Sequence, residues 1–185
     1  MFMEFEVFYV SVLILSLIIP TAVAVVYVVM FLILPMARGA VYVPSKQERV
    51  RTMIKLLDLK KGDKAIDVGS GDGRVVIEMA RSGADAYGIE INPFLVLWSR
   101  YRIKRHGFKK RPRIYWKNQW SQNFEEFNKI SVYGISYIMK DLEKKFQKEL
   151  KPGSLVASNA FTFPTWKAEK EEGELGGIVR LYRKN

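Results

Sequence analysis

The hydrophobic and polar positions of this chain follow one pattern near the N-terminus and another beyond it. From Val7 to Ala37 no residue is charged, a run of 31. A helix of about 20 residues crosses the hydrocarbon core of a bilayer, so this run predicts one transmembrane helix. A signal peptide has a basic start and a shorter apolar stretch, whereas this run follows Glu4 and Glu6. The pattern therefore predicts an N-terminal anchor, residues 1–37, and a second domain, residues 38–185.

Beyond the anchor, short apolar stretches alternate with segments that carry apolar residues at helical spacing. Ser45 and Glu48 have the spacing of a capping box at the start of the first such helix. Helices are predicted over residues 45–58, 73–82, 93–107, 121–128 and 138–150. Strands are predicted over residues 65–69, 84–91, 113–116, 130–136, 154–159, 166–171 and 177–183.

This alternation predicts an α/β fold, because strands that alternate with helices form open parallel sheets. The last two strands have no long helix between them, which predicts an antiparallel hairpin at one edge. We therefore expect a Rossmann-like, seven-stranded, mostly parallel sheet with helices on both faces, preceded by the transmembrane helix. In such sheets the ligand lies at the carboxyl ends of the strands, near the topological switch point.

Charge is distributed as unevenly as hydrophobicity. All 30 Lys and Arg follow residue 37, with 17 of the 19 acids, so residues 38–185 carry a net charge of +13. Basic residues flank the cytoplasmic side of membrane spans, which predicts a single-pass protein with a cytoplasmic catalytic domain. A basic domain is attracted to anionic lipid headgroups or to nucleic acid. With no cysteine and one histidine, we expect neither a thiol nucleophile nor a metal site.

Three glycines and two acids stand where the ligand is expected, in the stretch AIDVGSGDGRVV. A dinucleotide-binding loop reads G-x-G-x-x-G, whereas this one reads D-x-G-x-G-x-G. Asp67, at its start, would repel a pyrophosphate but suits a ligand with an ammonium group. S-adenosylmethionine has an amino group, a sulfonium and no phosphate. Glu90 closes the second predicted strand, where a carboxylate can bind both ribose hydroxyls, as it also can in NAD enzymes. The motif thus favours S-adenosylmethionine over NAD and over a tight turn without a ligand.

The glycine motif resembles the first motif of the class I methyltransferases, whose sheet has seven strands. Three further elements make the resemblance more specific: Tyr42-Val43-Pro44, Glu90-Ile91-Asn92-Pro93 and Pro164-Thr165-Trp166. With the anchor, they are similar to the family of the mitochondrial lysine methyltransferases that act on the ATP synthase c subunit and the adenine nucleotide translocase. Short archaeal protein lysine methyltransferases share the resemblance, which covers residues 40–183. It implies an S-adenosylmethionine-dependent protein lysine N-methyltransferase.

The resemblance also implies which residues bind the cofactor. Relatives often have an Asp after the third strand that binds the adenine amino group, and Asn118 stands at the matching position here. Its amide oxygen can accept the same hydrogen bond. The stretch Tyr133 to Ser136 departs from the more apolar element of the relatives, on the substrate side. The implied cofactor-binding residues are Asp67, Gly69, Ser70, Gly71, Asp72, Gly73, Glu90, Ile91, Asn92, Asn118 and Gln119.

A lysine nucleophile must lose its proton before it accepts a methyl group. Burial in an aromatic channel disfavours the ammonium form, so a dedicated catalytic base is not required. The candidates for this channel are Tyr42, Tyr133, Phe161 and Trp166, with Ser136 and Asn159 as polar guides; core packing is the alternative for each aromatic residue. Trp98, Trp116 and Trp120 are expected in the core or beside the cofactor. His106 precedes a glycine, so we expect it to cap the end of a helix.

The leading hypothesis is therefore a membrane-anchored enzyme that methylates lysines of membrane or membrane-proximal proteins. Its location would be the plasma membrane of a prokaryote or the mitochondrial inner membrane of a eukaryote. Methylation of a lipid or quinone, methylation of RNA, and a non-catalytic binding module remain alternatives. The anchor, and the lack of an N-P-P-Y element after the fourth strand, make nucleic acid the less favoured partner.

Overall fold

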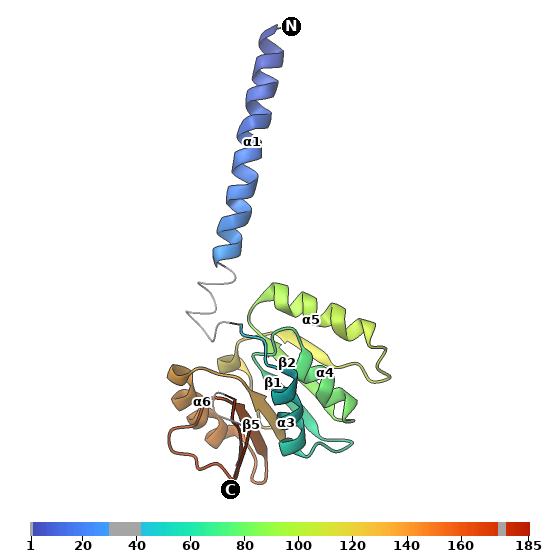
Figure 1. Ribbon diagram of the computed structural model, residues 1–185, viewed down its shortest axis with the longest axis vertical. Coiled ribbons are helices and arrows are strands. Elements are labelled where there is room, and N and C mark those ends of the chain that lie inside the picture. Colours follow the sequence, from blue (N-terminus) through green and yellow to red (C-terminus); the bar gives the residue numbers. More distant parts are fainter. Residues whose placement is uncertain (1, 30–41, 174–176) are drawn as a thin grey trace.

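The computed structural model describes residues 2–29, 42–173 and 177–185. Helix α1 (Phe2–Val28) contains most of the charge-free run and stands apart from the rest of the chain in Figure 1. Its segment Glu6–Val28 is long and apolar enough to cross a membrane, and none of its apolar window is buried. The predicted boundary between anchor and domain, at residue 37, lies outside the described residues.

Among residues 42–173 and 177–185, the strands form one seven-stranded sheet in the order β3-β2-β1-β4-β5-β7-β6. Only β7 runs antiparallel to its neighbours, β5 and β6, and all other pairs are parallel. The predicted fold and its antiparallel edge are thus confirmed. The strands are β1 (Lys64–Val68), β2 (Asp85–Glu90), β3 (Arg113–Trp116), β4 (Lys129–Val132), β5 (Leu155–Asn159), β6 (Lys170–Glu172) and β7 (Val179–Arg183).

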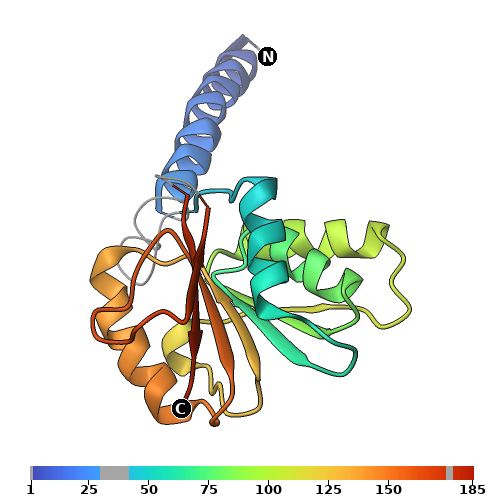
Figure 2. The ribbon, with the colours of Figure 1, turned by 60° about the horizontal axis from the view of Figure 1, so that its bottom comes forward.

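Helices cover both faces of the sheet, as Figure 2 shows. One face carries α3 (Gln47–Leu57), α4 (Arg74–Arg81) and α5 (Pro93–Arg105), and the other carries α6 (Ser136–Glu149). Side chains alternate between the faces along each strand. In β1, Ala65 belongs to the core under the first three helices and Ile66 to the core under α6. This alternation buries two hydrophobic layers and fixes which polar side chains meet at the strand ends.

One predicted strand is too long and one predicted helix is absent, because their residues contribute to loops instead. The strand predicted over 130–136 ends at Val132, and Tyr133 to Ile135 continue into the loop before α6. The helix predicted over 121–128 is absent, and a single 3-10 turn, η2 (Gln119–Ser121), stands before it. The Oδ1 atom of Asn118 starts that turn by accepting the Trp120 N–H at 3.0 Å. The edge strand predicted over 166–171 is shorter and later, at 170–172.

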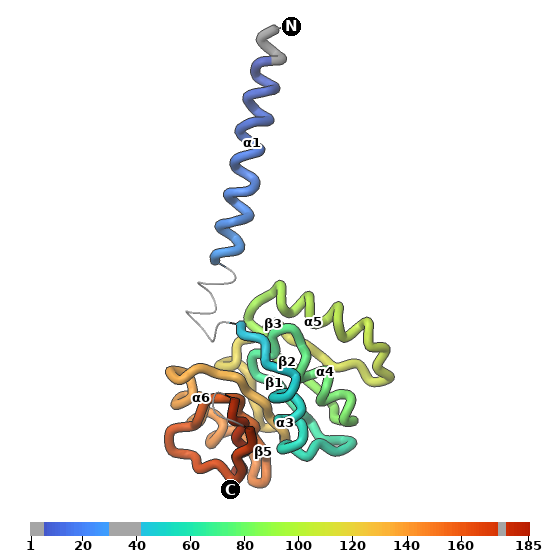
Figure 3. Tube along the Cα trace, viewed as in Figure 1, coloured from blue at the N-terminus to red at the C-terminus, as the bar shows by residue number. Residues whose placement is uncertain are grey.

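The predicted capping box at the start of α3 is also wrong. Lys46 is the N-cap, and no side chain caps the helix. The Ser45 hydroxyl instead accepts a hydrogen bond of 3.0 Å from Nδ2 of Asn159, at the end of β5. Figure 3 shows the segment before α3 crossing over the central strands. This tertiary contact therefore fixes the segment before α3 against the end of β5.

Candidate active site

A cavity of about 500 Å³ opens at the carboxyl ends of the central strands. Its walls come mainly from the loops that follow β1, β2, β3 and β4, and from residues 42–45 before α3; Phe161 after β5 and Tyr27 of α1 also line it. After β1 the chain crosses to β2 on one side of the central pair of strands, and after β4 it crosses to β5 on the other side. The cavity therefore lies at the topological switch point of the sheet. The ligand position predicted from the fold class is thus the position of the cavity.

The glycine loop between β1 and α4 forms the floor of this cavity. The N–H groups of Gly69 and Ser70 both donate to Ile89 O, at 3.0 and 2.9 Å, which joins the loop to β2. Gly71 has φ +52°, and a Cβ there would lie 2.5 Å from the Tyr42 ring. Gly73 has φ +78°, and a Cβ there would lie 2.9 Å from Ser99 of α5. Glycines therefore let the aromatic ring of Tyr42 and the helix α5 approach the loop backbone.

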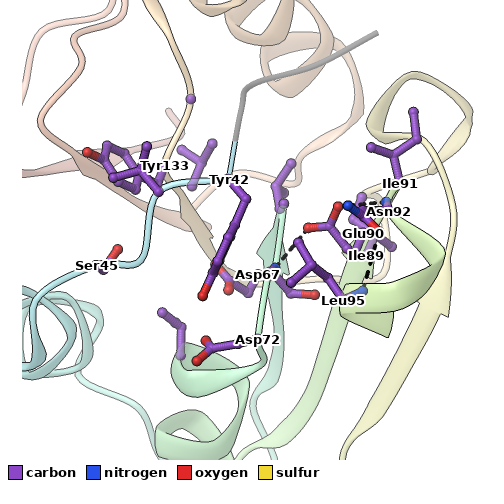
Figure 4. A pocket seen from close by; sticks show the side chains of 18 of the residues that line it. Tyr42, Ser45, Asp67, Asp72, Ile89, Glu90, Ile91, Asn92, Leu95 and Tyr133 are labelled. Atoms are coloured by element: carbon purple, nitrogen blue, oxygen red, sulfur yellow. Dashed lines mark hydrogen bonds between the residues drawn. The ribbon is translucent and has the colours of Figure 1, made fainter. Parts of the chain in front are cut away.

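Glu90 closes β2 and is buried beside the loop (Figure 4). Its Oε2 accepts the Gly71 N–H at 2.8 Å, and its Oε1 accepts the Asn92 N–H at 2.8 Å. Burial raises the pKa of Glu90, and these backbone hydrogen bonds oppose the rise. Each carboxylate oxygen keeps a second lone pair, so Glu90 can still accept two hydroxyl hydrogens. The residue fits a ligand with a ribose diol.

The two acids of the glycine motif have different partners. Asp67 is buried at the end of β1 and accepts a hydrogen bond from the Ser131 hydroxyl of β4. Burial raises the pKa of Asp67 to about 7, although the Ser131 hydrogen bond lowers it. Burial would also raise the pKa of Asp72, but hydrogen bonds and charge from Arg74 and Arg102 hold it below its usual value. Asp67 is therefore the acid of the motif that is left to balance a cationic ligand group.

The residues after β3 divide between the cavity and the loop structure. Lys117 and Gln119 line the cavity, and Gln119 is buried. Asn118 does not line it, because its side chain starts the η2 turn. The residue that sequence reasoning matched to the adenine-binding Asp therefore has a local hydrogen-bond partner, while its neighbour faces the cavity. Two of the implied residues are thus outside the cavity wall, Asn118 and Gly73.

Three of the six substrate-channel candidates line the cavity: Tyr42, Tyr133 and Phe161. The rings of Tyr133 and Phe161 lie 6.1 Å apart, and Tyr42 stands over the glycine loop (Figure 4). Burial, together with the charge of Asp72, raises the pKa of Tyr42, so its hydroxyl stays protonated at neutral pH. The cavity therefore has an aromatic side next to its acidic side.

The other three candidates have structural partners elsewhere. Trp166 packs against Phe163 and Tyr182, and its Nε1 donates to Arg183 O at 3.1 Å. Asn159 is buried and bonded to Ser45, and Ser136 begins α6. None of these three lines the cavity.

Further sequence expectations concern residues outside the cavity wall. The expectation that Trp98, Trp116 and Trp120 lie in the core is wrong, since all three are exposed. None of the three lines the cavity. His106 does cap the end of α5, as predicted. Sequence reasoning missed several residues of the wall that directly follow a strand or precede α3. These are Ser45, Lys117, Gly134 and Ile135.

Comparison with known proteins agrees with this geometry. Residues 67–170 match the family model described as the ANTKMT methyltransferase domain. The rat lysine N-methyltransferase named for the ATP synthase c subunit is 37% identical, over 72% of this chain and 61% of its own length. The chain thus spans about six-tenths of that relative. A protein-lysine N-methyltransferase of Saccharolobus islandicus is 29% identical, over 76% of this chain and 91% of its own.

A solved structure is similar over the same region. The RNA methyltransferase of Salinibacter ruber, in complex with S-adenosyl-L-homocysteine, superposes with a TM-score of 0.73 at 30% identity. The match covers 76% of this chain and 93% of the Salinibacter protein.

Proposed function

The chain belongs to the family of the ANTKMT methyltransferase domain, and from this premise we propose that it is an S-adenosylmethionine-dependent protein lysine N-methyltransferase. The observation that carries the proposal is one cavity with two unlike walls. Buried carboxylates, Asp67 and Glu90, stand on one side, and the rings of Tyr42, Tyr133 and Phe161 stand on the other. The first wall suits the polar groups of the cofactor, and the second suits the alkyl chain of a lysine.

The acidic wall and the glycine loop would hold S-adenosylmethionine. When bound, this cofactor supplies a methyl group that its sulfonium has already activated. Glu90 accepts the ribose hydroxyls with the lone pairs that its backbone partners leave free. The Asp67 carboxylate balances the ammonium group, and Gly71 lets the ligand approach the backbone. Gln119, rather than Asn118, would bind the adenine amino group, since Gln119 lines the cavity and Asn118 does not.

The aromatic wall would prepare the lysine. Tyr42, Tyr133 and Phe161 exclude water from its side chain and lower the pKa of the amine by disfavouring the ammonium form. They also hold the amine in line with the methyl group, and such positioning contributes much of the catalysis when the donor is already activated. No side chain of the protein needs to act as a dedicated base.

Helix α1 would anchor the enzyme in a membrane by a single pass, with residues 38–185 on the cytoplasmic side. Its substrates would be lysines of membrane or membrane-proximal proteins, as the name of the rat relative suggests. Tethering raises the effective concentration of enzyme and substrate in the membrane plane. The compartment is the plasma membrane in a prokaryote and the mitochondrial inner membrane in a eukaryote.

RNA methylation is the second candidate, because the Salinibacter protein carries that name and residues 38–185 are strongly basic. A labelled-methyl assay separates the two. Membranes of the source organism, solubilised in detergent, receive labelled S-adenosylmethionine and either wild type, Glu90→Gln or Glu126→Gln. Glu126 is exposed and pairs with Lys64 away from the cavity, so it is the matched control.

Label that resists nuclease and organic extraction and maps to lysine supports the proposal. We expect Glu90→Gln to raise the KM for S-adenosylmethionine about 10- to 100-fold, since it weakens charge-assisted hydrogen bonds. Label that nuclease releases would establish RNA as the substrate instead. Label in the organic phase would point to a lipid or quinone substrate.

A further inference from the structure

Helix α5 is apolar on two opposite sides. Its inner side buries Val96 and Ile103 in the core against the sheet, and Leu95, also buried, lines the cavity. Its outer side presents Leu97, Trp98 and Tyr101, each exposed by 50% to 63%. These three lie on one stripe, since helix positions three and four apart are neighbours. Clustered exposed apolar side chains of this size ordinarily mark an interaction site, so the outer stripe indicates a contact that the described residues do not supply.

A further exposed aromatic side chain stands at the edge of the sheet, near the start of α5. Trp116 ends the edge strand β3 and is 66% exposed, and its Nε1 donates at 2.8 Å to Ile91 O, just before α5. The rings of Trp98 and Tyr101 stack on each other, with centroids 5.6 Å apart. We name Leu97, Trp98, Tyr101 and Trp116 the aromatic face.

Positive charge surrounds the aromatic face. Residues 91–124 contain nine Lys and Arg and no Asp or Glu. Lys104, Lys109 and Arg111 are exposed at the end of α5 and in the loop after it. Acids from neighbouring elements are engaged with other members of this segment: Asp85 pairs with Lys110, and Asp72 pairs with Arg102. The surface therefore combines exposed aromatic rings with an excess of positive charge.

We propose that the aromatic face docks the enzyme flat on a bilayer that contains anionic lipid, a proposal that rests on the membrane anchoring proposed above. Trp and Tyr beside Lys and Arg are typical of helices that lie in the membrane interface. Trp98 and Tyr101 stack on each other rather than presenting separate platforms for bases, and Leu97 adds an aliphatic contact. These features, and an apolar α1 in the same chain, favour lipid over nucleic acid.

Docking by α5 would place the active site at the membrane surface. Asn92 and Leu95, at the start of α5, line the cavity, so a docked helix holds the cavity mouth beside the lipid. Tyr27, near the end of α1, also lines the cavity, so the helix proposed as the anchor ends beside the site. α1 would bring the site to the membrane, and the aromatic face would set the orientation of the domain there.

The four tryptophans make the proposal directly testable, since none of them lies in α1. The full chain is reconstituted in vesicles of phosphatidylcholine and phosphatidylglycerol with brominated acyl chains, which quench nearby tryptophan. One variant, Trp116→Phe, Trp120→Phe and Trp166→Phe, keeps only Trp98. The matched variant, Trp98→Phe, Trp116→Phe and Trp120→Phe, keeps only Trp166, which is partly buried and packs against the core on the α6 side of the sheet.

We expect bromolipid to quench the fluorescence of Trp98 and to leave the fluorescence of Trp166 unchanged. Lys104→Glu, Lys109→Glu and Arg111→Glu together should reduce the quenching of Trp98, because each lost cation lowers membrane association about fivefold. The matched control replaces Lys140, Lys144 and Lys148 by Glu. These residues are exposed on α6, on the other face of the sheet, and their replacement should leave the quenching of Trp98 unchanged.

Flotation of the vesicles separates the failure of docking from the failure of anchoring. Protein that floats with vesicles while Trp98 stays as bright as Trp166 overturns docking and leaves anchoring intact. Protein that does not float overturns both. A Trp98 signal that responds to an RNA oligonucleotide, but not to bromolipid, identifies the aromatic face as a nucleic-acid surface and also overturns the proposal.

Discussion

Three acidic side chains meet at the carboxyl ends of β1 and β2, and their partners give them different properties. Asp72 is held by two arginines, and Glu90 accepts two backbone N–H groups. Asp67 accepts one hydroxyl hydrogen, from Ser131, and is buried. Uncompensated burial disfavours the charged form, so the pKa of Asp67 rises to about 7. Near neutral pH, a bound ammonium group can therefore shift Asp67 from its protonated form to the carboxylate.

The first prediction follows from this pKa. Between about pH 6 and pH 8 the affinity for S-adenosylhomocysteine should increase with pH, because its ammonium group favours the Asp67 carboxylate. Calorimetric titration measures the slope. Asp67→Asn should remove it, and an equal slope in this variant would assign the pH dependence to another group.

The stability of the free protein should change in the opposite direction. The usual pKa of an Asp is 3.8, and that of folded Asp67 is about 7. The folded state therefore holds the proton over a range where the unfolded state has lost it, and the free energy of unfolding decreases as pH rises through this window. The thermal unfolding temperatures of wild type and Asp67→Asn, plotted against pH, should diverge between pH 3.8 and about pH 7. Above about pH 7 the two curves should run parallel.

The second prediction separates two neighbours after β3. Gln119 lines the cavity, whereas Asn118 starts the η2 turn. Gln119→Ala should weaken S-adenosylhomocysteine binding about two- to tenfold, the effect of one hydrogen bond. Asn118→Ala should mainly lower the thermal unfolding temperature. The reverse pattern would restore Asn118 to the adenine contact that the sequence resemblance implied.

At the scale of elements, the glycine loop and the segment before α3 depend on each other. Tyr42 can lie over the loop only because Gly71 has no Cβ, which would stand 2.5 Å from its ring. Gly69 also has a positive φ, but a Cβ there would meet no atom within 4 Å. The two glycines therefore share a backbone requirement and differ in one contact.

The third prediction uses this difference. In the ligand-free protein, Gly71→Ala should lower the free energy of unfolding by about 1–3 kcal/mol more than Gly69→Ala, the usual cost of overpacking. The excess should disappear in a Tyr42→Ala background, where the added methyl group has room. Denaturant unfolding of the double-mutant cycle measures it, and an excess that persists without the ring would assign it to the backbone alone.

The elements that the sequence predicted correctly are those whose signals are local. The periodic apolar residues of β1, β2 and α4 predict their type, and the order of strands and helices predicts the sheet. The failures involve long-range contacts. Ser45 looked like a helix cap, but its partner is Asn159, 114 residues later. Tyr133 has the pattern of a strand residue but lines the cavity, because the strand ends where the active-site loop begins.

The candidate site divides in the same way. Asp67, the glycine loop and Glu90 lie on consecutive strand ends, so the motif alone predicted their meeting. The substrate side draws on residues 42–45, the loop after β4 and Phe161, which are distant in sequence. Trp166 instead packs against the core under α6, and its indole N–H donates a hydrogen bond to Arg183 O on β7. An aromatic residue in a sequence does not reveal which wall it joins.

At the scale of the whole molecule, apolar and basic residues are segregated along the chain. α1 carries the apolar run, and no part of its apolar window is buried against the α/β region. Every Lys and Arg lies beyond it. The catalytic chemistry should therefore need only the sheet and its loops, while the anchor should determine which substrates the site encounters.

The last prediction compares the full chain with a chain that begins at Tyr42. On a soluble lysine peptide in detergent, the two should have similar kcat and KM, since every described residue that lines the cavity, except Tyr27, lies within residues 42–185. On a membrane-protein substrate in the same vesicle, the full chain should be faster by about 10²- to 10⁴-fold, because tethering raises the effective concentration of the substrate around the enzyme. Methyl transfer to both substrates measures the ratio. If the shorter chain lost activity equally on both substrates, α1 would support the fold rather than the encounter with substrate. If the two chains were equally active on both substrates, α1 would have no part in the mechanism.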